Sequence, residues 1–360
     1  MAVLVDKLGD TFSTSEMVVI GCGEDGDVYH KPGKPSTHYV ASDAGAEGRG
    51  QSVLRWRNAG KVTKAITELA RREQCTCILV TFPNEVYMYA AYRASKKLQI
   101  PLYTWFHNTY LDNRKGPLKW LAKYLQPRFF RHATVNFTMS DGMLDFFKEK
   151  YPQYTFATLE HGFDIPQVSY EPYQTKGEKI KLMYSGNISA SCLDATLRLF
   201  EIVRETPEYE LHIYGKTSAF EEFNIDTEGF ILHGFVPWDE FIGSFSKYDV
   251  MLLPHGLDGD RTEAEYKTIF PTRTVPLLYS NRPILAHTPK NVFFTDFLRK
   301  HDCAEIVDEK DKDAIHAAIR RLVSDDQRRG QLVKNAIKTA GLFDVNSVSK
   351  KLKEIIFEQS

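Results

Sequence analysis

The chain has 360 residues, of which 42% are hydrophobic and 26% charged, and its formal net charge is −1. This composition excludes a disordered protein, and the length favours two domains of ordinary size. We expect no signal peptide and no transmembrane span, because no apolar run is long enough to cross a bilayer. The five cysteines show no zinc or disulfide spacing, which favours a reducing compartment and a cytoplasmic protein.

The first part of the chain predicts strands and helices in alternation. Hydrophobic residues recur at helical spacing from Met1 to Phe12, and the first strand follows at residues 17–22. A loop rich in glycine and charge then occupies residues 23–50, with a short strand near 38–41. Further on, helices are expected at 52–73, 85–98, 117–130 and 141–150, and strands at 75–82, 101–107, 134–139 and 156–160.

The same alternation restarts after a polar linker at residues 166–179. Strands are expected at 181–184, 210–214, 229–235, 249–253, 284–286 and 305–307, and helices at 195–205, 310–323, 326–340 and 345–359. Short apolar strands between helices predict parallel sheets covered on both faces. We therefore expect an α/β protein with two doubly wound Rossmann-like domains facing a cleft. Their bounds are 1–165 and 180–343, followed by a C-terminal helix at 344–360.

The segment that follows the buried-looking strand 249–254 has the features of an anion site. The Phe270-Pro271 turn opens a short helix that Thr272 or Thr274 should cap, and Asn281 suits a left-handed exit from it. Free N–H groups at the start of that helix, together with the Arg273 guanidinium, predict a phosphate site. The alternative is an ordinary turn between two elements.

Small and polar residues also follow six of the predicted strands, where parallel sheets bind their ligands. One such loop would mean little, but six across two domains indicate a site in a cleft. The loops are at residues 106–108, 140–142, 160–162, 185–189, 214–216 and 233–234.

A basic stretch lies in the first half of the chain. Residues 86–131 contain nine Lys or Arg and one acid, Asp112, so that their charge is +8. Aromatic residues interleave with the basic ones between 114 and 131, which suits a helix on an anionic membrane surface, on the inner face of the membrane. A helix with one core face and one solvated basic face is the alternative. No motif supports nucleic-acid binding.

The strand ends and turns together resemble the GT-B glycosyltransferases, specifically the retaining group called family 4. The resemblance covers most of the chain from about Met17 onward. In the second half it rests on Tyr184-Ser-Gly-Asn187, His233-Gly-Phe-Val-Pro237, residues 248–254, and Phe270-Pro271 with residues 281–286. In the first half it rests on Phe106-His107, Thr138-Met-Ser140 and Glu160-His-Gly-Phe-Asp164.

By that resemblance, the second domain binds a nucleotide-sugar donor and the first binds a glycan or lipid-linked acceptor. The resemblance also implies that the C-terminal helix at 344–360 crosses back to the first domain. The reaction would be sugar transfer with retention, in polysaccharide or glycolipid biosynthesis, with no metal and no cofactor beyond the donor substrate. The catalytic candidates are His107, which aligns with a family histidine facing the donor sugar, and Glu263 or Glu265. The donor-binding candidates are Gly186, Asn187, Lys216, Phe235, Val236, Lys267, Phe270, Pro271, Thr272 and Arg273.

Several family residues are replaced in this sequence. The usual Arg and Lys of the donor domain fall at Asn187 and Cys192, and the two usual glutamates fall at Thr268 and Pro276. Arg273, Lys216 and Lys267 offer replacement cations for the diphosphate. Two alternatives therefore stay open: a catalytically degenerate GT-B subunit that binds or scaffolds a partner, and a GT-B-fold sugar-nucleotide epimerase.

Family members also begin with a central strand and a Gly-rich loop ahead of the first helix. Here Met1 already lies in the predicted helix. A parallel sheet without its central strand would leave backbone groups unpaired. We therefore expect either an earlier true start or a short strand formed by Met1–Val5.

Overall fold

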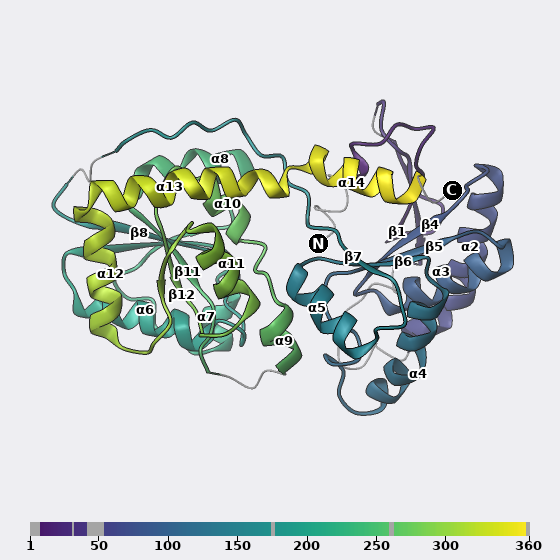
Figure 1. Cartoon of the computed structure of the whole chain (residues 1–360), viewed down its shortest axis with the longest axis horizontal. Coiled ribbons are helices and arrows are strands. Elements are labelled where there is room, and N and C mark those ends of the chain that lie inside the picture. Colours follow the sequence, from purple (N-terminus) through teal and green to yellow (C-terminus); the bar gives the residue numbers. More distant parts are fainter. Residues whose placement is uncertain (1–7, 31, 42–53, 174–176, 259–262, 358–360) are drawn as a thin grey trace. The chain divides into compact units, whose positions relative to one another are not determined.

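The chain divides into two compact units. The first comprises residues 1–164, 262–269 and 345–360, and the second comprises residues 165–261 and 270–344. Figure 1 shows a sheet with helices around it in each unit, as expected for doubly wound α/β domains, and this prediction is confirmed. The computed structural model describes residues 8–30, 32–41, 54–173, 177–258 and 263–357.

The second unit contains a six-stranded sheet in which every neighbouring pair is parallel. In chain order its strands are β8 (Ile180–Ser185), β9 (Tyr209–Tyr214), β10 (Ile231–Gly234), β11 (Val250–Pro254), β12 (Ile284–His287) and β13 (Glu305–Val307). Their spatial order is β10-β9-β8-β11-β12-β13, which is the Rossmann order 3-2-1-4-5-6. The strand order reverses between β8 and β11, and ligands bind beside such a reversal, outside the carboxyl ends of the strands.

Helices of the second unit bury the apolar faces of this sheet. Leu199 and Phe200 of α6 and Ile315 of α12 pack with Leu182 and Leu252 in one core. The sequence did not predict the short helices α7, α8 and α11, because helices of five to nine residues depend on packing more than on propensity. The helices are α6 (Leu193–Glu205), α7 (Ser218–Glu222), α8 (Trp238–Gly243), α10 (Thr274–Leu278), α11 (Phe293–His301), α12 (Lys312–Ser324) and α13 (Asp326–Ala340), with 3-10 turns at Phe245–Lys247 and Gly341–Phe343.

The first unit contains two sheets. The larger is fully parallel and consists of β4 (Ile78–Phe82), β5 (Leu102–Phe106), β6 (Val135–Thr138) and β7 (Phe156–Thr158). The smaller has the order β1-β3-β2 and consists of β1 (Val19–Gly23), β2 (Val28–Tyr29) and β3 (Thr37–Ala41). The helices are α2 (Ala59–Arg72), α3 (Glu85–Leu98), α4 (Pro117–His132), α5 (Asp141–Lys150), α9 (Glu263–Thr268) and α14 (Val345–Phe357), and a 3-10 turn at Leu54–Asn58 precedes α2.

The last helix, α14, belongs to the core of the first unit. Its residues Val348 and Leu352 pack with Tyr103 and Trp105 of β5, and Leu8 joins the same cluster. Because side chains alternate along a strand, His107 follows Tyr103 and Trp105 on the α14 side of the sheet. Of the helix predicted from Met1 to Phe12, residues 1–7 lie outside the described residues. The same is true of residues 42–50 of the predicted loop and of residues 52–53, where the next helix was predicted to begin.

The segment predicted as a linker is fastened to the second unit. Two guanidinium groups lie over the Tyr173 ring, that of Arg282 at 4.0 Å from the ring centroid and that of Arg329 at 4.9 Å. Arg329 also donates a hydrogen bond to the Tyr173 carbonyl oxygen, at 2.9 Å. Nearby, Asn281 exchanges two hydrogen bonds with the backbone of Glu171. The chain therefore enters the second unit well before β8.

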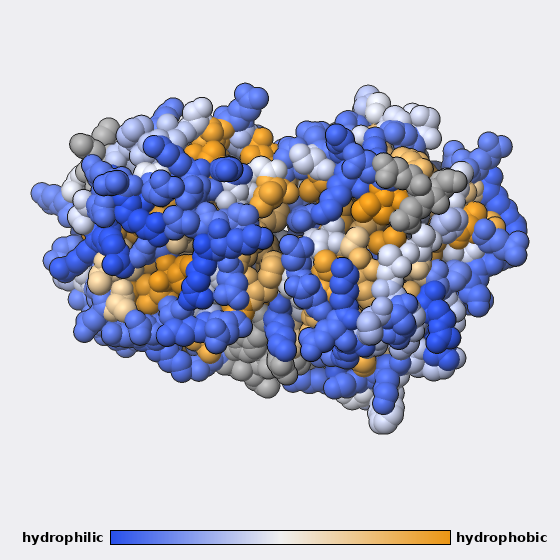
Figure 2. Space-filling view, in the orientation of Figure 1, coloured by the Kyte–Doolittle hydropathy of each residue, from blue (hydrophilic) through white to orange (hydrophobic). Residues whose placement is uncertain are grey.

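Hydrophilic side chains cover most of the face shown in Figure 2, and hydrophobic residues appear there as separate small patches. Among the residues that the structure describes, no helix is long and apolar enough to cross a membrane. All five cysteines are free thiols.

Candidate functional site

Three strands of the second unit end at glycines that bring their backbones close together. Gly186, Gly215 and Gly234 all have positive φ angles, at the carboxyl ends of β8, β9 and β10. A Cβ atom on Gly215 would lie only 2.7 Å from the carbonyl oxygen of Gly186, and the Gly215 N–H donates to the Gly234 oxygen at 2.9 Å. A side chain at Gly215 would force the ends of β8 and β9 apart, so this glycine keeps their backbones close together beside the sheet's switch point.

Arg273 reaches the loop that leaves β8. Its Nη1 donates to the Tyr184 hydroxyl at 2.8 Å and to the Ser185 carbonyl oxygen at 3.3 Å. Its Nη2 donates to the Asn187 carbonyl oxygen at 3.1 Å and lies 3.5 Å from the Cys192 sulfur. The guanidinium thus brings a fixed positive charge to the start of α6, from an element 80 residues further along the chain.

The cap predicted for the following helix is wrong. Arg273, not Thr272 or Thr274, is the N-cap of α10, and no side chain caps the helix. The chain already turns through backbone bonds, from the Thr274 N–H to Pro271 and from the Val275 N–H to Thr272, so a side-chain cap is not needed. Pro276 lies in the first turn of α10, where its missing N–H is harmless. Asn281 has φ +56°, the left-handed conformation that was predicted. Because α10 has only five residues, the charge of this turn comes mainly from the Arg273 side chain.

Cys192 is buried beside the Arg273 guanidinium. Burial is the largest single effect and by itself would raise the pKa of the thiol. The positive charge of Arg273 and hydrogen bonds with Ser189, Arg273 and Thr196 together outweigh it, so the pKa lies below the ordinary value. The thiol occupies the position at which the family resemblance places a lysine. Arg273 therefore supplies, from another element, a positive charge at this end of α6.

The loop that leaves β11 is tied to the same end of α6. Asp194 accepts hydrogen bonds from the N–H groups of Leu257 and Asp258, both at 2.9 Å. Arg198, one turn further along α6, donates to Nε2 of the buried His287 at 2.8 Å. Because Nδ1 of His287 bonds to the Val307 carbonyl oxygen, Nε2 is the acceptor for Arg198. These contacts join α6 to the ends of β11 and β12.

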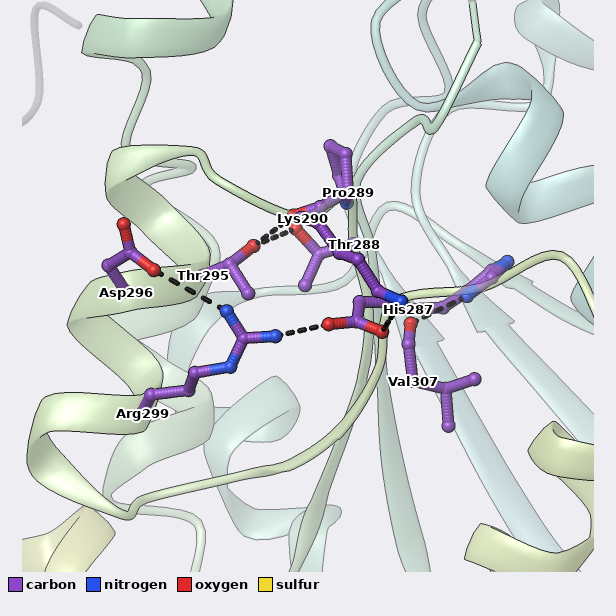
Figure 3. Close-up of polar contacts among 9 residues, drawn as sticks. His287, Thr288, Pro289, Lys290, Thr295, Asp296, Arg299 and Val307 are labelled. Carbon is purple, nitrogen blue, oxygen red and sulfur yellow. Dashed lines mark hydrogen bonds and ion pairs between the residues drawn. The ribbon is translucent and has the colours of Figure 1, made fainter.

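Further contacts hold the carboxyl end of β12 (Figure 3). Thr295 on α11 bonds to the Thr288 hydroxyl at 2.8 Å and to the Pro289 carbonyl oxygen at 2.7 Å. Arg299, one turn further, pairs with Asp296 and with Asp308. The sheet edge near the switch point is thus supported from several sides, which keeps a binding surface rigid.

The remaining candidates of the second unit differ in exposure. Lys216 and Thr272 are exposed, Val236 and Pro271 are half-buried, and the Phe235 side chain is 86% exposed. Phe270 instead packs its ring against Phe294, Phe297 and Phe343. Asn187 accepts a hydrogen bond from Arg273, and a Cβ atom on Gly186 would lie 3.7 Å from the same side chain. Lys216 and Phe235 each begin a loop after one of the strand-end glycines. Phe270 is therefore part of the core packing. Lys216, Thr272 and Phe235 are accessible from solvent, and Val236 and Pro271 are partly accessible.

The candidates before the Phe270-Pro271 turn belong to the first unit. Lys267 is exposed and Glu265 half-buried on α9, and the Glu263 side chain lies outside the described residues. The carbonyl oxygen of Thr268, at the end of this helix, accepts a 2.8 Å hydrogen bond from Ser140. Glu265 and Arg273, eight residues apart in sequence, therefore lie in different units.

In the first unit, His107 forms a buried pair with His161. Nε2 of His161 lies 2.7 Å from Nδ1 of His107, and the Trp105 ring packs against both imidazoles. Burial lowers the pKa of His161 to about 4, and burial together with His161 lowers that of His107 well below its ordinary value. Both rings are therefore neutral near pH 7.

We predict that this pair makes the first unit sensitive to acid. The unfolded chain binds a proton at each histidine near pH 6.5 and the folded chain does not, so stability falls as the pH drops from about 6.5 towards 4. His161 alone should cost roughly 2 kcal/mol at pH 5. Urea unfolding at pH 7 and pH 5 measures this loss. The His161→Gln variant should lose clearly less between the two pH values, and an equal loss in both proteins would refute the assignment.

Sequence reasoning missed the partners of both central residues. Tyr184, Ser185 and Cys192 surround Arg273, but they lie more than 80 residues before it. His161 was visible only as a strand-end histidine before a glycine. Among the described residues, no group of three or more His, Cys, Asp or Glu side chains is arranged to hold a metal ion.

No protein-family model matches the sequence, and no curated protein matches it either. Solved structures are similar to this chain at low sequence identity. Sucrose-phosphate synthase from Thermosynechococcus elongatus aligns with a TM-score of 0.74 and 13% identity, over 99% of this chain and 94% of its own. HepE of Anabaena, solved with UDP and glucose, aligns with a TM-score of 0.61 and 14% identity, over 90% of this chain and 86% of its own. The lipopolysaccharide outer core galactosyltransferase WaaB aligns with a TM-score of 0.57 and 16% identity, over 90% of this chain and 85% of its own. The chain therefore has the GT-B fold.

Proposed function

We propose that this chain is a glycosyltransferase that moves a sugar from a nucleotide-sugar donor to a glycan or lipid-linked acceptor. The observation that carries the proposal is the Arg273 guanidinium, held beside the switch point of a Rossmann-ordered sheet. A departing diphosphate gains negative charge as the glycosidic bond breaks, and a fixed cation there lowers the barrier by roughly 3 kcal/mol. A structure of HepE with UDP-glucose supports the donor class.

The other donor contacts follow from the same sheet edge. Lys216 is exposed directly after Gly215 and offers a second positive charge to the diphosphate. Phe235, the most exposed large hydrophobic side chain among the described residues, offers a flat ring for a nucleobase, with Val236 next to it. In the first unit, His107 would contact a sugar substrate. We further propose that transfer proceeds with retention and without a bound metal.

A second candidate function is a GT-B subunit that binds a partner without catalysis. The observation that favours it is that both Nη groups of Arg273 already contact the β8–α6 loop. A diphosphate would have to share those donors, whereas a structural arginine would not. The family glutamates replaced by Thr268 and Pro276 favour the same alternative.

Nucleotide binding is the first test. Thermal unfolding should be measured with UDP, GDP and ADP and with their common sugar conjugates, each at millimolar concentration. A ligand present at about 100 times its Kd stabilises the folded chain by about 2.7 kcal/mol. We expect one nucleotide and its conjugates to raise the melting temperature and the others to leave it unchanged. No shift with any of them would refute the donor-binding proposal.

Turnover separates the two candidate functions. A transferase without its acceptor should slowly hydrolyse the matching nucleotide sugar, and mass spectrometry would detect the free sugar and nucleoside diphosphate. Binding without hydrolysis, also in the presence of glycan and lipid-linked acceptors, would favour the non-catalytic subunit.

The acceptor proposal draws on the surface of α4. Trp120 and Tyr124 are 74% and 57% exposed on this helix, whereas Leu125 and Phe129 face the core. The charge of Lys123 lies 5.7 Å from the Trp120 ring, and that of Arg128 lies 3.3 Å from the Tyr124 ring. Exposed aromatic rings among basic side chains suit the interface of an anionic membrane. We propose that this surface brings the first unit to the cytoplasmic face of a membrane, where a lipid-linked acceptor would reside.

Co-sedimentation with vesicles tests this surface. The protein should pellet with anionic vesicles and not with neutral ones, and less so as salt rises. Each well-placed basic residue contributes roughly 1 kcal/mol, so a Lys119/Lys123/Arg128 triple alanine variant should bind about a hundredfold more weakly. The matched control is a triple alanine variant of Lys300, Lys338 and Lys350, three exposed lysines outside α4. Equal losses of vesicle binding in the two variants would show that the net charge of the protein, and not the surface of α4, causes the binding.

A further inference from the structure

The proposed sugar contact of His107 depends on which of its two ring nitrogens carries the proton, and the position of His107 alone does not determine this. Neutral imidazole carries one proton, on Nδ1 or on Nε2, and only one of these tautomers donates a hydrogen bond from Nε2. Nδ1 of His107 is occupied by His161, at 2.7 Å. Nε2 of His107 is buried and has no hydrogen-bond partner within the part of the chain that the structure describes. This unused atom is the one left for a ligand.

The geometry points to His161 as a positioning residue that fixes the tautomer of His107. Its Nε2–H donates to Nδ1 of His107, so that the proton of His107 resides on Nε2. In this arrangement both rings carry the proton on Nε2, the tautomer that neutral imidazole favours intrinsically. Nε2–H of His107 then donates a hydrogen bond to an oxygen of a bound sugar substrate, such as a hydroxyl. This inference rests on the proposed function for its ligand, but not for the tautomer itself.

The backbone on both sides of His161 is anchored, so the ring position is well defined. Before it, the Leu159 carbonyl oxygen accepts a 2.9 Å hydrogen bond from Nε1 of Trp105, and Glu160 pairs with Lys351 of α14 at 3.0 Å. After it, the Phe163 carbonyl oxygen accepts from the Val345 N–H at 2.9 Å. A Cβ atom on Gly162 would lie 2.9 Å from the Val345 side chain, so α14 also packs directly on this turn.

The surroundings keep the pair neutral and hold its orientation. The ring centroids of the two imidazoles are 4.5 Å apart, and Trp105 lies 4.4 Å from His107 and 5.9 Å from His161. Only 2% of His107 and 8% of His161 is exposed. A protonated ring here would lose its hydration, and Glu160, the carboxylate next to His161 in the chain, is paired with Lys351. A neutral pair with one shared hydrogen bond is therefore the stable state at neutral pH.

Nitrogen NMR of the ligand-free full chain, labelled with 15N only in histidine, tests the tautomer directly. The His107 signals are assigned by their loss in a His107→Gln variant. In the native protein at pH 7 we expect a protonated Nε2 and an unprotonated Nδ1 for His107. A His161→Phe variant keeps a ring but has no donor, and its His107 should show both tautomers in exchange. In a His161→Gln variant, the amide N–H replaces Nε2–H, and the native pattern should return.

Turnover of the matching nucleotide sugar links the tautomer to function. His161→Phe should lower kcat roughly ten- to a hundredfold, the range typical for residues that orient a liganding histidine, and His161→Gln should stay within about threefold of native. A proton on Nδ1 of His107 in the native protein, or an unchanged tautomer in His161→Phe, would overturn the inference. If no nucleotide sugar turns over at all, the proposed function fails, but the NMR result still decides the role of His161. If His161→Phe does not fold, the native spectrum and His161→Gln decide it.

Discussion

Replacing Arg273 with alanine is expected to abolish nucleotide binding and also to destabilise the second unit by roughly 3 kcal/mol. The side chain meets Tyr184, Ser185, Asn187 and Cys192, and most of these groups are buried. Without the guanidinium, the Tyr184 hydroxyl and the carbonyl oxygens of Ser185 and Asn187 each lose a charged donor. A hydrogen bond to a charged group contributes about 1.5–3 kcal/mol. The cation that would face the diphosphate disappears at the same time.

Three measurements distinguish these effects. Calorimetry should show a lower melting temperature, and hydrogen exchange should become faster in the loop after β8, because that loop loses its anchor. The nucleotide that stabilises the native chain should no longer do so. Arg273→Lys should retain only part of the stability and part of the nucleotide binding, because an ammonium group lacks the planar fork that reaches several acceptors at once.

The matched control is Lys216→Ala. Lys216 is exposed, so its loss should leave the melting temperature within about 1 °C and weaken only nucleotide binding. If Arg273→Ala kept both its stability and its nucleotide shift, Arg273 would be neither the organiser of this loop nor a ligand of the diphosphate.

A second large effect is expected from Arg329→Met, which should cost the second unit roughly 3–5 kcal/mol. The Arg329 side chain is only 4% exposed. It donates to the carbonyl oxygens of Leu322 and Val323 in the last turn of α12, at 3.1 and 2.7 Å, and to that of Tyr173 at 2.9 Å. A cation at the end of a helix satisfies its free carbonyl groups and opposes its dipole. Methionine fills similar volume but leaves these oxygens without a donor.

Urea unfolding of Arg329→Met should be compared with that of Arg328→Met. The neighbouring Arg328 is 36% exposed and pairs with Asp302 and Glu305, so its loss should cost about 1 kcal/mol or less. Limited proteolysis should also cleave Arg329→Met faster between residues 165 and 173, because Tyr173 loses one of its two guanidinium partners. Equal stability of the two variants would show that the buried Arg329 contributes no more to the stability of the second unit than the more exposed Arg328 does.

The sequence by itself determined the fold class and the main elements. Most of the longer helices and strands were predicted within a few residues, for example α3 at Glu85–Leu98 and α5 at Asp141–Lys150. Their apolar periodicity and their caps, Asn84 and Ser140, are local signals that need no tertiary information. The strand-end glycines and the resemblance to GT-B enzymes followed from the same local patterns.

Only the tertiary structure decided what surrounds Arg273 and His107. Their partners are separated from them by more than 50 residues and come together only because parallel strands end at one edge of a sheet. The same holds for the cap of α10, where backbone turns took the place of a threonine side chain. Long-range contacts of this kind depend on how the strands and helices pack, and packing leaves no periodic mark in a single sequence.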